Sequence, residues 1–373
     1  MSELGKTRIA IYVVSSILLA LVVVAVVNNY SSSNYISPGL IQSPQNNFVI
    51  LMNDPPVLPL GQVNSLYLYY SNILLHSSSD KWISLNESGS INLLEVQNVA
   101  RIIAVENIPM GKYNIIRLEN LSATVNYYGQ NYSVEVYPKN LDSNPSNSII
   151  VNSKNITFVD IAIFPKLFIL GNEKGGVQFD MILKSKAFGT NDARSIFNFA
   201  STTQLSDFLK KGNNVTIVGT EIYKHIYSNI ANAKVIITNV TISEDELSIN
   251  IMNVGNATVE VNYILIYSFK NQRSNAPSFI STIFIVNKDG SLQQINTLNT
   301  TILYSNSTGY IIQPGEEVTL YYNGELNFVE FNNSHGWKSS HAKLELISGE
   351  KFTIVLVGDY SILASTQIIL IKE

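Results

Sequence analysis

The first apolar pattern in the chain is a run without charged residues from Ile9 to Val27, preceded by Lys6 and Arg8. As a helix, this run would extend about 28 Å, close to the roughly 30 Å hydrocarbon thickness of a bilayer. Positive charges near a membrane helix tend to stay in the cytoplasm. The pattern therefore predicts a cytoplasmic leader (1–8), a single transmembrane helix (9–27) that attaches the chain to the membrane, and an extracellular part (28–373).

Two alternative interpretations predict that the chain is cleaved near this run. A cleaved secretory signal has a shorter apolar core and small residues at the cut, whereas Ala25-Val26-Val27 ends in a β-branched residue. A basic leader before an apolar helix is also similar to archaeal type IV pilin leaders, which are cut just before the helix. Those leaders usually carry Gly or Ala where this chain has Arg8.

After the helix, residues 28–47 are rich in Asn, Ser, Pro and Gly without apolar periodicity, which predicts a flexible stalk. From Phe48 onward, short apolar and aromatic runs alternate with turn residues, as in antiparallel β domains. Leu66, Leu68 and Tyr70 follow a period of two, and the phase then shifts within Val63 to Leu75, which predicts a bulge or a bend. The expected strands cover residues 48–52, 63–75, 81–85, 113–121, 123–128, 131–136 and 156–164, and residues 91–96 are either a strand or a helical turn.

The strand pattern is interrupted over residues 171–233, where residues 192–211 have approximate helical spacing and Gly212 follows as a stop. Alternation resumes over residues 234–373, with turn spacing typical of an immunoglobulin-like sandwich. The predicted fold class is mainly β: a transmembrane helix, then two antiparallel β-sandwich domains (48–170 and 234–373) joined by a connector (171–233) with a short helix.

An ordered set of motifs in the first β domain resembles a known family. The set is Asp54-Pro55-Pro56, Val63 to His76 followed by Trp82, Asn92-Leu93-Leu94, and Pro109 to Leu118. It is similar to the exported β-sandwich family called domain of unknown function 4382, over about residues 47–170. The resemblance implies an extracytoplasmic β-sandwich and no catalytic residues. The turns Asn253-x-Gly255 and Pro314-Gly315-Glu316 are similar to those of archaeal immunoglobulin-like surface domains.

Composition narrows the function classes. Charged residues make up only 14% of the chain, its net charge is −4, and it has no cysteine. The chain has no basic stripe of the kind that nucleic-acid binding needs, so no nucleic-acid partner is expected. The absence of cysteine excludes disulfides, thiolate metal sites and cysteine nucleophiles. A surface with few charges and many Asn and Tyr side chains is typical of an acidic medium, which is a hypothesis about where the protein works.

No His-Glu-x-x-His or Gly-x-Ser-x-Gly motif occurs in the sequence, and the two Ser-x-x-Lys matches, Ser78 to Lys81 and Ser348 to Lys351, are expected to be turns. The four histidines, His76, His225, His335 and His341, are too scattered to predict a metal site. Paired acids occur only as neighbours in turns, at residues 244–246 and 316–317, where adjacent side chains tend to point apart. No catalytic, cofactor-binding or metal-ligating residue is predicted, and the protein is expected not to be an enzyme.

The strongest candidate site is an aromatic face. If Leu66, Leu68 and Tyr70 face the core, Tyr67 and Tyr69 must face outward. Two outward rings predict a surface that stacks on glycans or meets an envelope protein, although they could also pack on a neighbouring strand, stalk or domain. Arg117 is expected either on an open face or paired with Glu95 or Glu119.

Possible glycosylation sites accompany this face. Asn-x-Ser/Thr sequons begin at Asn29, Asn86, Asn120, Asn131, Asn155, Asn214, Asn239, Asn256, Asn299, Asn306 and Asn332. Together these patterns predict a non-enzymatic, membrane-anchored cell-surface protein with a binding or structural role. The alternative is a pilus or filament-associated subunit that assembles through its N-terminal helix.

Overall fold

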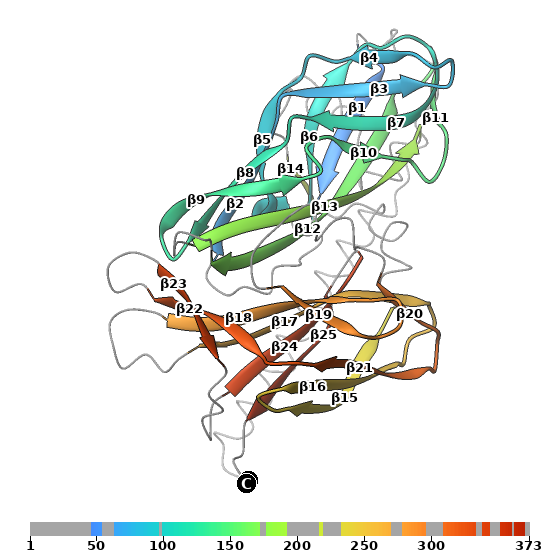
Figure 1. Cartoon of the computed structure of the whole chain (residues 1–373). Coiled ribbons are helices and arrows are strands. Elements are labelled where there is room, and N and C mark those ends of the chain that lie inside the picture. The colour runs from blue at the N-terminus through green and yellow to red at the C-terminus, as the bar shows by residue number, and fades with distance from the viewer. Residues whose placement is uncertain are drawn as a thin grey trace, which may run out of the picture. The chain divides into compact units, whose positions relative to one another are not determined.

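Strands dominate the computed structural model of the protein. It describes residues 46–53, 63–96, 99–171, 177–191, 216–218, 233–269, 278–295, 309–332, 338–343, 351–359 and 362–369. These residues form several β-sheets, and their one helical element is the 3-10 turn η1 (Leu93–Val96) (Figure 1). Within these ranges no helix has the length and hydropathy to span a bilayer. The predicted membrane helix, the stalk and the helix over residues 192–211 lie outside the described residues.

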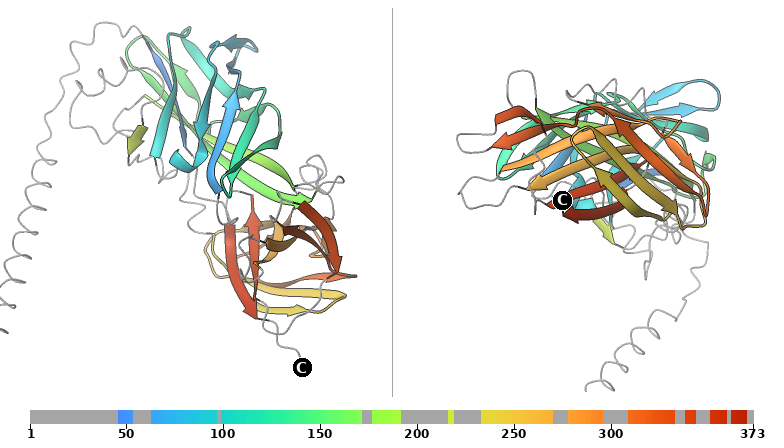
Figure 2. Two further views of the ribbon diagram at one scale, coloured as in Figure 1. Left: turned by 90° about the vertical axis from the view of Figure 1, so that its left-hand side faces the viewer. Right: turned by 60° about the horizontal axis from the view of Figure 1, so that its bottom comes forward.

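The largest sheet has nine strands. Their order is β14 (Thr216–Val218), β6 (Val99–Glu106), β1 (Phe48–Asn53), β12 (Thr157–Gly171), β13 (Val177–Thr190), β9 (Gln130–Tyr137), β8 (Ser122–Tyr127), β2 (Val63–Tyr70) and β5 (Gly89–Asn92). β1 is parallel to β12 and β13 is parallel to β9, whereas the other neighbours are antiparallel. The prediction of an antiparallel domain is therefore wrong for these two pairs, because alternation along a strand does not reveal the direction of its neighbour. The long strands β12 and β13 run side by side in Figures 1 and 2.

The long strand β13 corrects one expectation. The sequence pattern predicted that the strand rhythm stops at Gly171, but Val177–Thr190 pair with β12 along their whole length. Polar side chains at Asp180, Lys184 and Lys186 interrupt the alternation that would have identified the strand. The apolar alternation is therefore interrupted as the sequence shows, but the interrupted residues still form a strand.

A second sheet packs against the first. It contains β10 (Leu141–Ser143), β7 (Gly111–Glu119), β3 (Asn72–Ser77) and β4 (Trp82–Ser84), and β11 (Ile149–Val151) also pairs with β7. The chain passes from β2 of the first sheet to β3 of the second through a bend at Ser71. The phase shift in the sequence is this bend, because the chain leaves one sheet there and enters the other.

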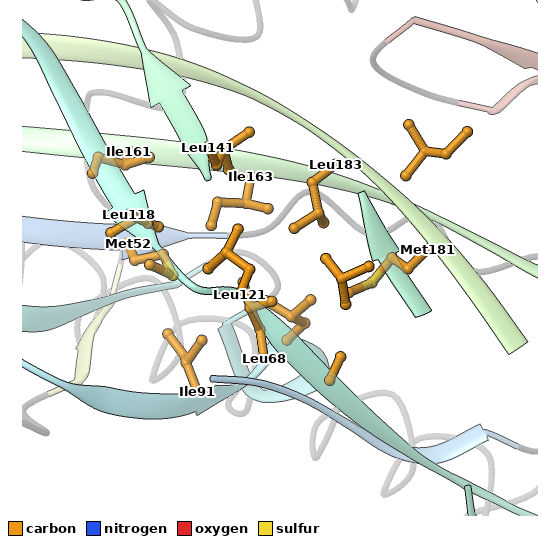
Figure 3. Close-up of a cluster of buried hydrophobic side chains, with 14 of the residues drawn as sticks. Met52, Leu68, Ile91, Leu118, Leu121, Leu141, Ile161, Ile163, Met181 and Leu183 are labelled. Atoms are coloured by element: carbon orange, nitrogen blue, oxygen red, sulfur yellow. The ribbon is translucent and has the colours of Figure 1, made fainter. Parts of the chain in front are cut away.

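Both sheets supply side chains to one apolar core, an arrangement consistent with a β-sandwich. Figure 3 shows Leu118 and Leu141 from the second sheet among Leu68, Ile161 and Met181 from the first, all of them buried. In β12, the odd-numbered Val159, Ile161 and Ile163 belong to this core. The alternation seen in the sequence thus sets which side chains meet between the sheets.

Two further sheets form from the C-terminal strands. One contains β15 (Val235–Ile242), β16 (Glu246–Asn253) and β21 (Glu317–Asn323). The other contains β23 (Lys338–Lys343), β22 (Asn327–Asn332), β18 (Ser278–Val286), β17 (Val259–Phe269), β24 (Lys351–Gly358) and β25 (Ile362–Ile369), with β19 (Leu292–Ile295) on β18 and β20 (Tyr310–Ile312) on β17.

The central strand β17 is buried on both faces. Ile264 and Ile266 belong to a second apolar core with β16, whereas Tyr263 and Leu265 belong to the core that also contains β12 and β13. The rings of Phe168 and Tyr263 meet edge to face with their centroids 5.2 Å apart. A continuous apolar run is what a strand with two covered faces requires.

Candidate functional site

Tyr67 and Tyr69 project from the outer face of β2. Each tyrosine is 37% exposed, while Leu66 and Leu68 between and beside them are fully buried. The two rings are stacked, with centroids 6.3 Å apart and an interplanar angle of 29°. The outward orientation predicted from the alternation is therefore confirmed. What the two rings bind stays a prediction.

Neutral polar groups continue this surface across the sheet. Tyr67 pairs with Thr124 of β8, which pairs with Ser133 of β9. The Tyr69 hydroxyl lies 3.2 Å from Thr124 Oγ1. Asn126 donates from Nδ2 to Asn131 Oδ1 at 2.7 Å. We call the set Tyr67, Tyr69, Thr124, Asn126, Asn131 and Ser133 the tyrosine face.

The tyrosine face carries no formal charge. Strands β2, β5 and β8 have no charged residue along their length, and they lie with β9 at one end of the nine-stranded sheet (Figure 1). Glu135 of β9 is exposed on the same side of the sheet, where it forms an ion pair with Lys139 at 2.8 Å. Hydroxyl and amide groups can both donate and accept hydrogen bonds, while the rings offer flat apolar surface. This combination suits a neutral ligand with many hydroxyl groups.

The tyrosines of the neighbouring hairpin belong to a different cluster. Tyr127 is buried, and its ring lies 4.8 Å from Tyr128 and 5.4 Å from Phe179, centroid to centroid. Tyr132 packs on Phe179 at 5.0 Å. Burial raises the pKa of the Tyr127 hydroxyl. These rings support the sheet from within, so they do not extend the tyrosine face.

A second exposed aromatic group lies on the outer face of the other sheet. Trp82 is 41% exposed, with the Arg117 guanidinium carbon 4.4 Å from its ring centroid and the His76 ring 4.7 Å away. His76 bonds Asn114 through Nδ1 at 2.8 Å and Asp80 through Nε2 at 3.0 Å. In the sequence, Trp82 contributed only to the family resemblance and was not predicted as a candidate site residue, because a ring on a three-residue strand gives little periodic signal.

Arg117 lies on this open face, as one of the two expectations stated, but its partner is Asp142. Nε and Nη2 donate to the two carboxylate oxygens of Asp142 at 2.6 and 2.8 Å. Glu119 instead accepts from Asn72, and Glu95 accepts from Asn92. The bidentate hydrogen bond to Asp142 holds the guanidinium over Trp82. Arg117 therefore has a structural contact on each side, with Asp142 and with Trp82.

Two ionisable groups are buried on β12. Asp160 is fully buried and accepts a hydrogen bond from Asn53 Nδ2, and burial raises the pKa of its carboxyl to about 7. Lys166 is 5% exposed, and its amine lies 3.8 Å from Asp359 Oδ1 and 5.1 Å from the ring centroid of Tyr263. Burial lowers the pKa of Lys166 to about 7, although Asp359 opposes the shift.

Metal-binding geometry is not found in the described part of the chain. No group of three or more His, Asp or Glu side chains converges there. The acidic turn at residues 244–246 leads into β16, and Asp245 accepts a hydrogen bond from Ser243 at 3.0 Å. His225 and His335 lie outside the described residues, as does the side chain of His341.

The described sequon asparagines are all exposed: Asn86, Asn120, Asn131, Asn155, Asn239 and Asn256. The Asn155 sequon differs from the others because its Thr157 is buried and donates to the Ile150 carbonyl at 3.1 Å. Asn29, Asn214, Asn299 and Asn306 lie outside the described residues, and so does the side chain of Asn332.

The motif that carried the family resemblance has a clear structural role. Tyr113 is buried in the first core, and its hydroxyl donates to the Pro109 carbonyl at 2.7 Å, closing the turn that leads into β7. Residues 46–167 match the family described as "Domain of unknown function (DUF4382)". The DUF4382 match confirms the resemblance expected over about residues 47–170, and it includes the whole tyrosine face. No curated protein matches the chain.

Proposed function

We propose that the protein is a non-enzymatic, membrane-anchored cell-surface protein whose tyrosine face binds neutral carbohydrate of the envelope. The observation that supports this proposal is the pair of stacked, half-exposed rings of Tyr67 and Tyr69 beside uncharged hydroxyl and amide groups. The apolar C–H face of a sugar ring stacks on an aromatic ring, and its hydroxyls bond with amides and alcohols.

The rest of the proposed architecture presents this face outside the cell. Ile9–Val27 anchors the chain with its N-terminus in the cytoplasm, and residues 28–47 act as a stalk. Two β-sandwich domains follow, of which the second is immunoglobulin-like. Their multi-sheet structure and apolar cores support this assignment. No cofactor and no nucleic-acid partner enters the proposal.

The test replaces both rings. We expect the double variant Tyr67→Ser/Tyr69→Ser of the full chain to lose roughly ten-fold or more in affinity on an array of neutral oligosaccharides, since two aromatic contacts contribute about 1–3 kcal/mol. The melting temperature should change by only a few degrees because the rings are half-exposed.

The matched control is Tyr321→Ser. Tyr321 is 41% exposed on β21, which belongs to another sheet, and its loss should leave carbohydrate affinity unchanged. Equal binding by the double variant and the natural chain would refute the carbohydrate site. A large drop in melting temperature would show that the rings are structural.

The alternative is a filament-associated subunit, favoured by the basic leader directly before the apolar run. In that case a pilin-type peptidase would leave Ile9 as the first residue of the mature chain. Mass spectrometry of the native N-terminus separates the two proposals, because a retained Met1 or Ser2 excludes the filament subunit.

A further inference from the structure

One sequon lies on the tyrosine face itself. Asn131 opens the sequon Asn131-Tyr132-Ser133 in β9, and both Asn131 and Ser133 are exposed. Ser133 pairs with Thr124, which pairs with Tyr67, so that one cross-strand row joins the sequon to the first ring. Asn131 belongs to the next row and pairs with Asn126.

The distance between the sequon and the rings is short. Asn131 and Tyr67 lie two strands and two residues apart in the sheet register. At about 4.8 Å per strand and 3.4 Å per residue, their backbones are roughly 12 Å apart on the same face. A short oligosaccharide can span this gap.

The Asn131 amide is also oriented for modification. Its oxygen accepts the bond from Asn126 Nδ2 at 2.7 Å. Such a bond fixes the amide plane through the oxygen and leaves the nitrogen available as the site of attachment. Tyr132, the middle residue of the sequon, points to the opposite face and packs on Phe179.

We propose that an N-glycan on Asn131 folds back onto Tyr67 and Tyr69 and competes with external carbohydrate for the tyrosine face. This inference rests on the proposed function and adds its regulation. The modification is transfer of an oligosaccharide from a lipid-linked phosphate donor. A bond forms between Asn131 Nδ2 and the anomeric carbon, the bond from that carbon to the phosphate oxygen breaks, and the amide loses one proton to solvent.

Tethering makes such competition effective even for a weak contact. A group held by a short flexible linker has an effective concentration in the millimolar range, provided that the linker can span the two sites. Stacking of one sugar on an exposed ring pair is itself weak. Because the effective concentration of the attached glycan is high, the glycan would nevertheless occupy the rings for much of the time. The apparent affinity for free glycan should then fall by roughly two- to ten-fold.

The experiment compares the full chain from a host that glycosylates Asn131 with the same chain from a host that does not. The probe is the N-glycan released from the glycosylated chain and labelled with a fluorophore, and binding is measured by fluorescence polarisation. Occupancy of each sequon is measured by peptide mass spectrometry. We expect tighter probe binding by the unglycosylated chain.

Variants assign the effect to one sequon. Because Asn131 and Ser133 belong to the tyrosine face, each variant is compared with the same variant from the other host. In Asn131→Gln and, by a second route, Ser133→Ala, the difference in probe affinity between the two hosts should disappear. Asn256→Gln, which removes an exposed sequon in the turn before β17, should keep that difference. Tyr67→Ser/Tyr69→Ser should bind the probe weakly from either host.

The outcomes separate this inference from the proposed function. If the unglycosylated chain does not bind the probe, the carbohydrate site itself is absent and both proposals fail. If both preparations bind equally while Asn131 is occupied, the site stands and its regulation by the attached glycan is overturned. Loss of the difference between hosts only in Asn256→Gln would also overturn it.

Discussion

Asp160 is a carboxyl in an environment that disfavours its charged form, because its side chain is fully buried. A carboxyl without solvent resists ionisation, and Asn53, which favours the charged form by its hydrogen bond, offsets only part of that cost. Because the folded-state pKa is about 7 and the unfolded value is about 3.8, the folded state holds more protons between these values. Stability must therefore fall as the pH rises from about 4 to 7.

This gives a prediction for Asp160→Asn. Between pH 5 and pH 8, the natural chain should lose about 2–3 kcal/mol of unfolding free energy through this one group. The variant, which cannot ionise, should show a much flatter profile in urea denaturation series. A small slope should persist because burial and Glu87 also raise the pKa of Glu106.

Glu244→Gln serves as the control, since Glu244 is exposed in the acidic turn before β16. Its pH profile should follow that of the natural chain. Equal slopes in Asp160→Asn and the natural chain would show that the buried carboxyl does not titrate in this range. A rise in stability toward acid pH would also agree with the hypothesis that the protein works in an acidic medium.

At the scale of elements, β12 is a buried strand that nevertheless contains ionisable side chains. It pairs with β1 and β13, is buried on both faces, and yet holds Asp160 and Lys166. The Lys166 amine shares Asp359 with Lys184, whose amine bonds the same carboxylate oxygen. Glu260 of β17 raises the pKa of Lys166 and Lys184 lowers it, and Asp359 also acts on Lys186.

The prediction for this element is that Lys166→Met stabilises the protein at neutral pH. The folded-state pKa of Lys166 is about 7 against 10.5 in the unfolded chain, so the unfolded state holds more protons between these values. The natural chain should gain about 2 kcal/mol from pH 7 to pH 9, and the variant should lose most of that gain.

Asp359 keeps Lys184 in this variant, so no charge is left buried alone. Lys154→Met, at an exposed turn position, is the control and should behave as the natural chain does. Lower stability of Lys166→Met at pH 7 would contradict the prediction, because it would mean that the amine contributes more by its ion pair than burial costs.

For the whole molecule, the two buried groups act in opposite pH ranges. From the two pKa shifts, we expect stability to fall up to about pH 7 because of Asp160 and to rise above it because of Lys166. The profile of unfolding free energy between pH 4 and pH 9 should therefore have a minimum near pH 7, where most proteins are near their maximum. The same denaturation series checks this shape. Asp160→Asn should remove the fall below pH 7, and Lys166→Met should remove the rise above it.

Several features of the molecule could be predicted from sequence because they are local. Alternation in β2 determined which side chains face the core, and Tyr67 and Tyr69 are exposed as that pattern requires. The phase shift after Tyr70 marked the bend between two sheets. The segment over residues 91–96 combined both alternatives, since Asn92 ends β5 and Leu93 begins η1.

Other features depended on tertiary structure. The sequence suggested Glu95 or Glu119 for Arg117, but strand pairing between β7 and β10 places Asp142 directly opposite it. Lys166 and Asp359 are far apart in the chain, and their contact exists only because β12 and the end of β24 approach each other. Strand β13 was not predicted because polar residues such as Lys184 interrupt its alternation. The partner of Lys184, Asp359, is distant in sequence, so no local pattern reveals the contact.

The division has a physical reason. A period of two is a property of the extended backbone, so the amino-acid sequence by itself determined the mainly β class, the inward and outward sides of β2 and the family match over residues 46–167. Sheet order and register depend on which strands meet after collapse, because each backbone offers the same hydrogen-bonding groups. Only the tertiary structure therefore decided that Asn131 shares a face with Tyr67 and that two buried charges lie on one strand.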